Sequence, residues 1–351
     1  MREKPLISLL SPFEWAYLSG VKLHQWLYSA GIWKVRTLAK PVVSVGNLTA
    51  GGTGKTPTVI ALGEMLLASG YKISVLLRGY KGAYKRGTLL VSDGRRILSS
   101  PEMAGDEALV ISRSLPEAIV AVGKNRAKVG EMIERTFNVN LHLLDDGFQH
   151  LRLSRALNLL LIDTTDPFGG GHLLPLGRLR EPLRGASRAD AVVLTRTNHG
   201  QDYARLLDCL KKVNPQFPCF KVQQTLNFGD EQGTAVSNSP HSFAGTRALA
   251  FAGIANPGQF YGSLRALGVN LVYGISFPDH HRYTLRDLEK IRRKCLETDV
   301  QLVVTTEKDR ENLGHLSLDP LRLVVAKVVF EFDEPMELLE LIKKKARPVA
   351  E

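Results

Sequence analysis

The chain has 351 residues, which is enough for one large or two ordinary domains. A hydrophobic content of 44% with regular Gly and Pro punctuation is typical of a globular protein and excludes a disordered chain. The net charge of +11 indicates an anionic partner. No helix-turn-helix, zinc finger or aromatic RNA-binding pattern is present, so we expect no nucleic acid and favour a membrane surface or a phosphorylated substrate. The three cysteines are odd in number and lack metal-ligand spacing, which argues against a disulfide framework and predicts a reduced, cytoplasmic setting.

Residues 1–36 form the first predicted segment, and they hold all three tryptophans of the chain. Aromatic and basic side chains are mixed there on a helical pattern, which predicts a helix that lies in a membrane interface. No apolar run approaches the ~18–20 residues that span a bilayer, and no compact hydrophobic stretch precedes a cleavage site. The alternative is an amphipathic helix that packs on the protein core.

Residues 37–226 show short apolar runs that alternate with helical patterns. Apolar runs without polar alternation are typical of parallel strands that are covered by helices on both faces. We therefore predict the α/β class, with a doubly wound, mostly parallel sheet of the P-loop NTPase type and ligands at the carboxyl ends of its strands. The expected strands are 42–48, 72–77, 118–122, 141–146, 157–163 and 191–195.

The first of these strands leads into a glycine-rich turn that ends in Gly54-Lys55-Thr56. A strand, a glycine loop and a helix in this order form a phosphate cradle, because loop amides and the helix N-terminus can point at anionic oxygens. We expect Lys55 to reach the β- and γ-phosphates and Thr56 to join a Mg²⁺ shell. The alternative is an ordinary turn with a chance Gly-Lys-Thr. Thr49 stands where the usual P-loop pattern has its first glycine. The predicted cradle comprises Thr49, Ala50, Gly51, Gly52, Thr53, Gly54, Lys55 and Thr56.

Acidic residues mark two further places in this lobe. Asp145 and Asp146 end the strand at 141–146, as in a Walker B element, where a carboxylate at the strand edge holds Mg²⁺ directly or through water. Alone such a pair is often a helix N-cap, but beside a P-loop it converges on the same metal. Asp106 precedes an apolar helical stretch, so capping is an equal alternative to a functional role.

Basic residues follow three of the strands, at the edge of the sheet where ligands bind in this architecture. Each loop could be a solvated charged face. Three such loops in one series of strand ends are better explained by an anionic substrate. The loops are 78–82, 123–126 and 175–184.

Residues 227–351 predict a second, smaller α/β lobe with a C-terminal helix at 336–345, joined to the first by a connection or surface hairpin at 227–247. The stretch Phe-Pro-Asp-His-His-Arg-Tyr at 277–283 closes one strand of this lobe. An aspartate could orient an imidazole that acts as a base there, whereas adjacent histidines do not converge on one metal ion. Thr-Glu-Lys-Asp at 306–309 resembles a GTPase base-reading segment only loosely.

Together these motifs resemble the tetraacyldisaccharide 4′-kinase family, the membrane-associated kinases of lipid A biosynthesis in Gram-negative bacteria. The resemblance covers nearly the whole chain, and a threonine at position 49 is typical of that family. It rests on SVGNLTAGGTGKTP (44–57), LLRGYKG (76–82), GDE (105–107), LDDGFQH (144–150), GRLREP (177–182) and FPDHHRY (277–283).

The resemblance implies transfer of the γ-phosphoryl group of ATP, with Mg²⁺, to the 4′-hydroxyl of a tetraacyldisaccharide 1-phosphate. It also implies an N-terminal helix that docks peripherally at the cytoplasmic face of the inner membrane. Asp106 and His280 would form the base pair, with His281 as the neighbour that could be confused with it. Lys55, Thr56, Asp145 and Asp146 would take the nucleotide and metal roles, and Arg78, Arg126, Gln149, Arg180 and Glu181 would contact nucleotide or sugar.

Two other functions are compatible with a P-loop. One is a soluble small-molecule kinase whose N-terminal helix belongs to the core. The other is a nucleotide-dependent switch or assembly ATPase whose basic loops bind a protein or nucleic acid.

Overall fold

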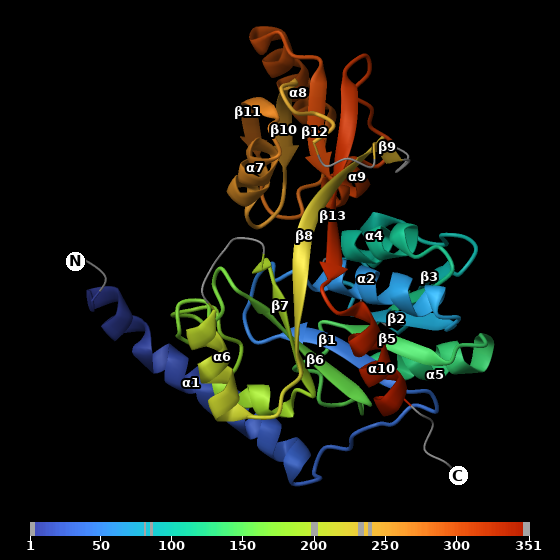
Figure 1. Cartoon of the computed structure of the whole chain (residues 1–351), viewed down its shortest axis with the longest axis vertical. Helices are drawn as coiled ribbons and strands as arrows, with labels where there is room; N and C mark the ends of the chain where they lie inside the picture. Colours follow the sequence, from blue (N-terminus) through green and yellow to red (C-terminus); the bar gives the residue numbers. More distant parts are fainter. Residues whose placement is uncertain are drawn as a thin grey trace.

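The structure is a computed structural model that describes residues 4–80, 82–84, 87–197, 203–230, 235–237 and 241–346. Lys81 of the LLRGYKG motif, parts of the 227–247 connection and both chain ends lie outside the described residues. Two lobes are joined through one mixed sheet, whose strand order is β11-β10-β12-β13-β8-β7-β6-β1-β5-β2-β4-β3, with β9 paired to β8 (Figure 1).

The first lobe holds the predicted parallel strands. The buried apolar runs of β1, β5 and β6 pair in parallel at its centre, with Val45 of β1 opposite Asp145 of β5. A short antiparallel edge strand, β3, was not predicted. The strands are β1 (Val42–Asn47), β2 (Ile73–Leu77), β3 (Leu89–Asp93), β4 (Ile119–Val122), β5 (Leu141–Asp145), β6 (Leu157–Asp163) and β7 (Ala191–Thr195).

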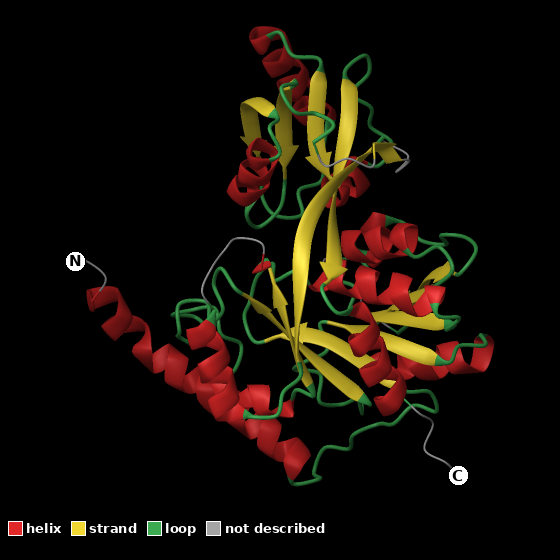
Figure 2. Ribbon diagram, in the orientation of Figure 1, coloured by secondary structure: helices red, strands yellow, loops and turns green. Residues whose placement is uncertain are grey.

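Helices cover both faces of this sheet, as the doubly wound prediction requires (Figure 2). On one face α2 and α4 bury their apolar side chains in a single cluster with the strands. On the other face α5 closes one cluster, and α6, η1 and part of α1 close another. These elements are α1 (Lys4–Ser29), α2 (Lys55–Ala68), α3 (Pro101–Ala104), α4 (Asp106–Ser114), α5 (Arg126–Thr136), η1 (Leu183–Arg188) and α6 (Ala204–Val213).

Two long strands carry the chain between the lobes. β8 (Cys219–Gly229) pairs with β7 near its start and then antiparallel with β13 (Arg322–Phe332), which pairs with β12 in the second lobe. Figure 1 shows this ribbon running from one lobe into the other. β8 was not predicted, and it crosses the expected lobe boundary at 226/227.

The second lobe is a smaller parallel sheet with helices on both faces. α7 packs on one face, and α8 and the end of α9 close the other. Its elements are β9 (Ala235–Ser237), β10 (Arg247–Ala252), α7 (Pro257–Ala266), β11 (Asn270–Ser276), α8 (Leu285–Thr298), β12 (Leu302–Thr306) and α9 (Glu307–Leu313).

The last helix, α10 (Pro335–Lys345), returns to the first lobe. Its buried Leu338, Leu339 and Ile342 join the same apolar cluster as α2. Chain order alone groups this helix with the second lobe, which it follows in the sequence. The structure places it beside α2 because β13 ends in the first lobe and delivers the chain there (Figure 1).

Helix α1 presents two different faces. Glu14, Tyr17 and Gln25 lie toward the protein and bond to it, the Tyr17 hydroxyl donating to the Arg180 carbonyl at 2.9 Å. Within the part of the chain that the structure describes, no helix is long and apolar enough to cross a membrane. The opposite side and the following turn expose large apolar side chains, namely Phe13, Trp15, Leu23, Trp26, Ile32, Trp33 and Val35.

Close packing of β1 against the loop after β5 predicts that Gly46→Ala destabilises the protein. A Cβ at position 46 would lie 2.6 Å from the backbone nitrogen of Phe148, whose side chain is fully buried. Because backbone cannot yield as a flexible side chain does, we expect a loss of about 1–3 kcal/mol in the free energy of unfolding. Urea denaturation measures it. Gly20→Ala on α1, where no atom lies within 4 Å, is the matched control, and equal midpoints for the two variants would contradict the prediction.

Candidate active site

A cavity of about 1550 Å³ lies between the lobes. Its walls come from the P-loop, the ends of β2 and β5, the loop at 174–181 and α1 on one side, and from residues 254–260, 279–280 and 306–308 on the other. Ligand pockets usually have about 300–1,000 Å³. The volume is therefore sufficient for a nucleotide together with the polar part of a second substrate.

The predicted phosphate cradle occupies the turn between β1 and α2. Gly51 and Gly54 have φ angles of 117° and 84°, which only glycine adopts without strain. Gly54 also touches the ring of Phe330, where a Cβ would lie 2.6 Å from Cζ. Residues 50–56 line the cavity, and helix α2 begins at Lys55, so its free amides face the same space.

Thr49, the departure from the usual P-loop pattern, has a structural role in the described contacts. It is buried, forms an antiparallel bridge with Leu179, and its Oγ1 accepts a hydrogen bond from Asn47 Nδ2 at 3.3 Å. It does not line the cavity. A glycine could not make the side-chain bond to Asn47. The backbone bridge to Leu179 ties the loop to the 177–182 segment.

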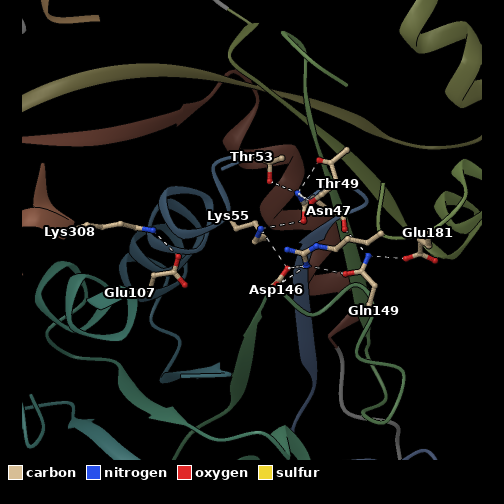
Figure 3. Close-up of polar contacts among 10 residues, drawn as sticks. Asn47, Thr49, Thr53, Lys55, Glu107, Asp146, Gln149, Glu181 and Lys308 are labelled. Carbon is tan, nitrogen blue, oxygen red and sulfur yellow. Dashed lines mark hydrogen bonds and ion pairs between the residues drawn. The ribbon is translucent and has the colours of Figure 1, made fainter. Parts of the chain in front are cut away.

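Lys55 is held at the centre of the site, as Figure 3 shows. Its Nζ lies 3.3 Å from Asn47 Oδ1 and 3.6 Å from Asp146 Oδ1. Asn47 also donates to Thr53 Oγ1 at 2.7 Å, so one amide fixes both the loop and the lysine. Asn47 was not predicted as a site residue, although its place at the end of β1 is a signal for such a role.

The two carboxylates after β5 have opposite electrostatic environments. Burial, aided by Glu107 and Asp146, raises the pKa of Asp145 to about 7. Burial alone would raise the pKa of Asp146 as well, but the charges of Lys55 and Arg180 outweigh it and lower that pKa. Asp145 Oδ1 is buried and has no hydrogen-bond partner among the described residues. An unpartnered carboxylate oxygen in the cavity that Thr56 also lines suits a hard cation such as Mg²⁺.

A chain of polar contacts links Asp146 to the predicted substrate residues (Figure 3). Arg180 Nη1 donates to both Asp146 oxygens at 2.8 and 3.0 Å. Gln149 Nε2 donates to Glu181 Oε1 at 2.9 Å, and Arg188 donates to both Glu181 oxygens at 2.7 Å. Arg188, from η1, was not predicted. All of these side chains line the cavity.

Arg78 and Arg126 differ in their access to the cavity. Arg78 lines the cavity, whereas Arg126 is buried at the start of α5 and does not line it. Burial and the charge of Arg78 lower the pKa of Arg126 to about 10. Arg126 also interacts electrostatically with Asp145 and Asp146, so it can balance the acidic pair from behind the cavity wall.

Asp106 and His280 meet across the lobes although they are 174 residues apart. His280 Nδ1 lies 2.8 Å from Asp106 Oδ2, and this hydrogen bond raises the pKa of His280. Burial raises the pKa of Asp106, but the bond to His280 and the charge of Lys308 bring it below its usual value. His280 lines the cavity and has a φ of 60°, unusual for a residue with a side chain. His281 instead contacts Asp287, at 3.1 Å from Nε2 to Oδ2.

Further charged residues around the cavity were not predicted. Arg196 is ion-paired with Asp163 and donates to the Gly52 carbonyl at 2.9 Å, beside the P-loop. On the opposite wall Lys308 Nζ lies 2.8 Å from Glu107 Oε1 and joins the two lobes (Figure 3). Asp163 ends β6 and Arg196 directly follows β7, and a charged residue at the end of a strand is a signal for such a place.

Comparisons with known proteins agree with these features along nearly the whole chain. The profile of the family described as Tetraacyldisaccharide-1-P 4'-kinase matches residues 6–347. The tetraacyldisaccharide 4'-kinase of Pelobacter propionicus is 40% identical over 332 residues, which cover 92% of this chain and 90% of that protein. The one from Desulfatibacillum aliphaticivorans is 38% identical over 330 residues, covering 93% and 89%.

A solved structure is similar to this chain over nearly its whole length. The crystal structure of the "apo" form of LpxK from Aquifex aeolicus in complex with ATP has a TM-score of 0.79 and 31% identity, covering 97% of this chain and 100% of that one. This likeness confirms the predicted α/β fold class, and the relatives favour the lipid-sugar kinase over the small-molecule kinase and the switch ATPase. The chain therefore belongs to the tetraacyldisaccharide-1-phosphate 4′-kinase family.

Proposed function

We propose that this chain performs the reaction of its family with His280 as general base and Asp106 as the group that orients it. The protein is an ATP-dependent kinase of lipid A synthesis, which phosphorylates the 4′-hydroxyl of a tetraacyldisaccharide 1-phosphate. The observation that carries the proposed roles is the 2.8 Å contact between His280 and Asp106 at the wall of the cavity.

The path of the proton in the proposed reaction follows from that contact. With Nδ1–H donated to Asp106, the lone pair of His280 Nε2 can accept the proton of the 4′-hydroxyl, and Asp279, whose Oδ2 lies 3.7 Å from Nε2, adds negative charge beside it. As the sugar oxygen forms its bond to the γ-phosphorus, the bond from that phosphorus to the ADP oxygen breaks. Asp106 stabilises the imidazolium that results. Because the two groups come from different lobes, the pair forms only where the lobes meet.

The P-loop and its neighbours are proposed to bind the nucleotide. Loop and helix amides within residues 51–56 would hold the phosphates, and Lys55 would neutralise charge on the transferred group. Thr56, Asp145 and Asp146 would hold Mg²⁺, which when bound neutralises charge on the β- and γ-oxygens. The unpartnered Asp145 oxygen supports this assignment.

The acceptor is proposed to enter beside the nucleotide and contact Arg78, Gln149, Arg180 and Glu181. These side chains line the cavity next to α1, and they combine cationic and hydrogen-bonding groups suited to a sugar phosphate. Arg126 is proposed to act through its charge on Asp145 and Asp146, since it does not reach the cavity.

The activity is tested by incubating the protein with Mg-ATP and a tetraacyldisaccharide 1-phosphate. A bisphosphorylated product, seen by mass spectrometry, is the expected result. Absence of product from the folded wild-type chain would contradict the function. Omitting Mg²⁺ in the presence of a chelator tests the metal assignment, because the folded protein should then lose activity and regain it when Mg²⁺ is restored.

We also propose that α1 docks peripherally on the cytoplasmic face of the bacterial inner membrane. Trp15, Leu23 and Trp26 recur at helical spacing on the side opposite Tyr17 and Gln25, and they are more than half exposed. Amphipathic aromatic rings favour the membrane–water boundary. The helix would thus leave acyl chains in the bilayer while the sugar reaches the cavity beside it.

Replacing Trp15, Trp26 and Trp33 by serine is expected to weaken membrane binding. Burying a large apolar side chain contributes about 1.5–3 kcal/mol relative to leaving it exposed, so the triple change should lower vesicle affinity by at least about tenfold. Co-sedimentation with vesicles of mixed zwitterionic and anionic phospholipids measures the effect. ATP binding should be unchanged, and equal partitioning of wild type and variant would contradict the docking surface.

A further inference from the structure

The segment Thr306–Asp309, where β12 passes into α9, has no role in the chemistry described so far. α9 lies against α4 of the first lobe, and its residues bond to Asp106 and to Tyr283, which ends the loop that carries His280. The loose resemblance of this segment to a GTPase base-reading motif indicates no function in a kinase. Its contacts with the two lobes indicate another role.

Lys308 reaches across to the half that carries Asp106. Its Nζ lies 2.8 Å from Oε1 of Glu107, the residue that follows Asp106 and donates its amide to Asp106 Oδ1 at 2.9 Å. Burial would lower the pKa of Lys308, but Glu107 and Asp106 raise it, so the lysine stays charged. Two more contacts join the same helices, a 2.6 Å ion pair from Arg113 to Glu311 and a 3.4 Å bond from Asn312 to Asp106.

Asp309 holds the half that carries His280. Its side chain is fully buried, and Oδ1 accepts hydrogen bonds from the Gly253 amide and the Tyr283 hydroxyl, both at 2.7 Å. The Gly253 carbonyl in turn accepts from the His280 amide at 2.8 Å. Asp309 thus fixes the residue that anchors the His280 backbone and, through Tyr283, the end of the loop.

Such bracing is needed because the conformation of His280 is costly. A left-handed φ in a residue with a side chain is strained and persists only where the surroundings impose it. Position also matters for rate, since a displacement of about 1 Å in a catalytic group can cost about 10²-fold.

We propose that Lys308 and Asp309 are positioning residues that align the two halves of the catalytic pair, one from each side. The proposal rests on the assignment of Asp106 and His280 as the base pair. Neither residue needs to contact the transferred phosphoryl group. Thr306 supports the arrangement, because its hydroxyl donates to Asp309 Oδ2 at 2.6 Å.

A double-mutant cycle with His280→Ala tests the proposal. Lys308→Met and Tyr283→Phe should each lower kcat by about 10–10²-fold in the wild-type background, with little change in KM for ATP. In the His280→Ala background the same substitutions should have little further effect, because there is no base left to align. Asp309→Asn completes the series if thermal melting shows that it folds, and Lys308→Arg should recover part of the rate.

The controls separate the possible failures. Asp287→Asn is the matched carboxylate change, because Asp287 bonds to His281 and not to the residues that hold His280. This variant should leave kcat nearly unchanged. Equal losses in both backgrounds would overturn the positioning role, as would a rise in the acceptor KM with constant kcat in Lys308→Met. If His280→Ala itself keeps full activity, the base assignment fails instead.

Discussion

His280→Ala is expected to lower kcat by about 10²–10⁴-fold, the usual contribution of a positioned general base. The imidazole lines the cavity and is held by Asp106 at 2.8 Å, whereas alanine leaves the sugar hydroxyl without a proton acceptor. Asp106→Asn should lower kcat as well, and the double variant should be hardly slower than the worse single variant, since the pair acts as one unit. Steady-state kinetics with the acylated disaccharide measures both.

The pH profile gives this prediction a direction. A base must be neutral, so the rate should rise with pH through the pKa of His280, which the bond to Asp106 raises above its ordinary value. Asp106→Asn removes that carboxylate, and the acid limb should therefore move to lower pH while the plateau falls. A limb that moves to higher pH would contradict the arrangement.

His281 supplies the matched control. It is adjacent in sequence, but it contacts Asp287 and stacks on Phe277, with ring centroids 4.8 Å apart, and it does not line the cavity. His281→Ala should therefore keep kcat nearly unchanged. Full activity in His280→Ala together with a large loss in His281→Ala would show that the wrong histidine was assigned.

Lys55→Ala is the second large effect, with an expected loss of about 10²–10³-fold in kcat, as for removal of one preorganised donor to developing charge. Lys55 lies 3.6 Å from Asp146 and 3.3 Å from Asn47, so it is already held where the phosphates would bind. Its removal also leaves Asp146 with less compensating charge. ATP affinity should fall too, which isothermal titration calorimetry measures independently of turnover.

Two variants test the specificity of that loss. Lys128→Ala removes an exposed lysine on α5 and should leave kcat and ATP affinity unchanged. Lys55→Arg keeps the charge but not the compact ammonium, so it should recover only part of the activity. Equal kinetics for Lys55→Ala and wild type would remove Lys55 from the proposed machinery.

The sequence predicts the buried parallel strands of the first lobe well, because uninterrupted apolar runs between helical patterns are typical of strands that helices cover on both faces. It misses β3 and β8. β3 is a short edge strand, and β8 alternates polar residues such as Lys221 and Gln223 with buried ones, because it forms a partly exposed ribbon between lobes. The place of α10 depends on where β13 ends, which no local pattern contains.

The site residues also fall into two groups, those in contiguous motifs and those that only the fold brings together. The P-loop and the Asp145–Asp146 pair are contiguous motifs, so their neighbourhood follows from the sequence. Asp106 alone is indistinguishable from a helix cap, and only folding brings it to His280. Lys308 and Glu107 belong to different lobes and give no local signal at all.

The return of β13 and α10 to the first lobe has a consequence for biosynthesis. Phe330 supports the P-loop at Gly54, and Leu338 and Ile342 complete the cluster around α2. The nucleotide-binding half therefore remains unfinished while the ribosome is still translating its last structural elements, although β1 and α2 emerge early. Domains that are contiguous in the chain can fold in order from the N-terminus during synthesis. Here the second lobe is an insertion between β8 and β13, and truncation before α10 would therefore damage the first lobe, whose first strand begins at Val42.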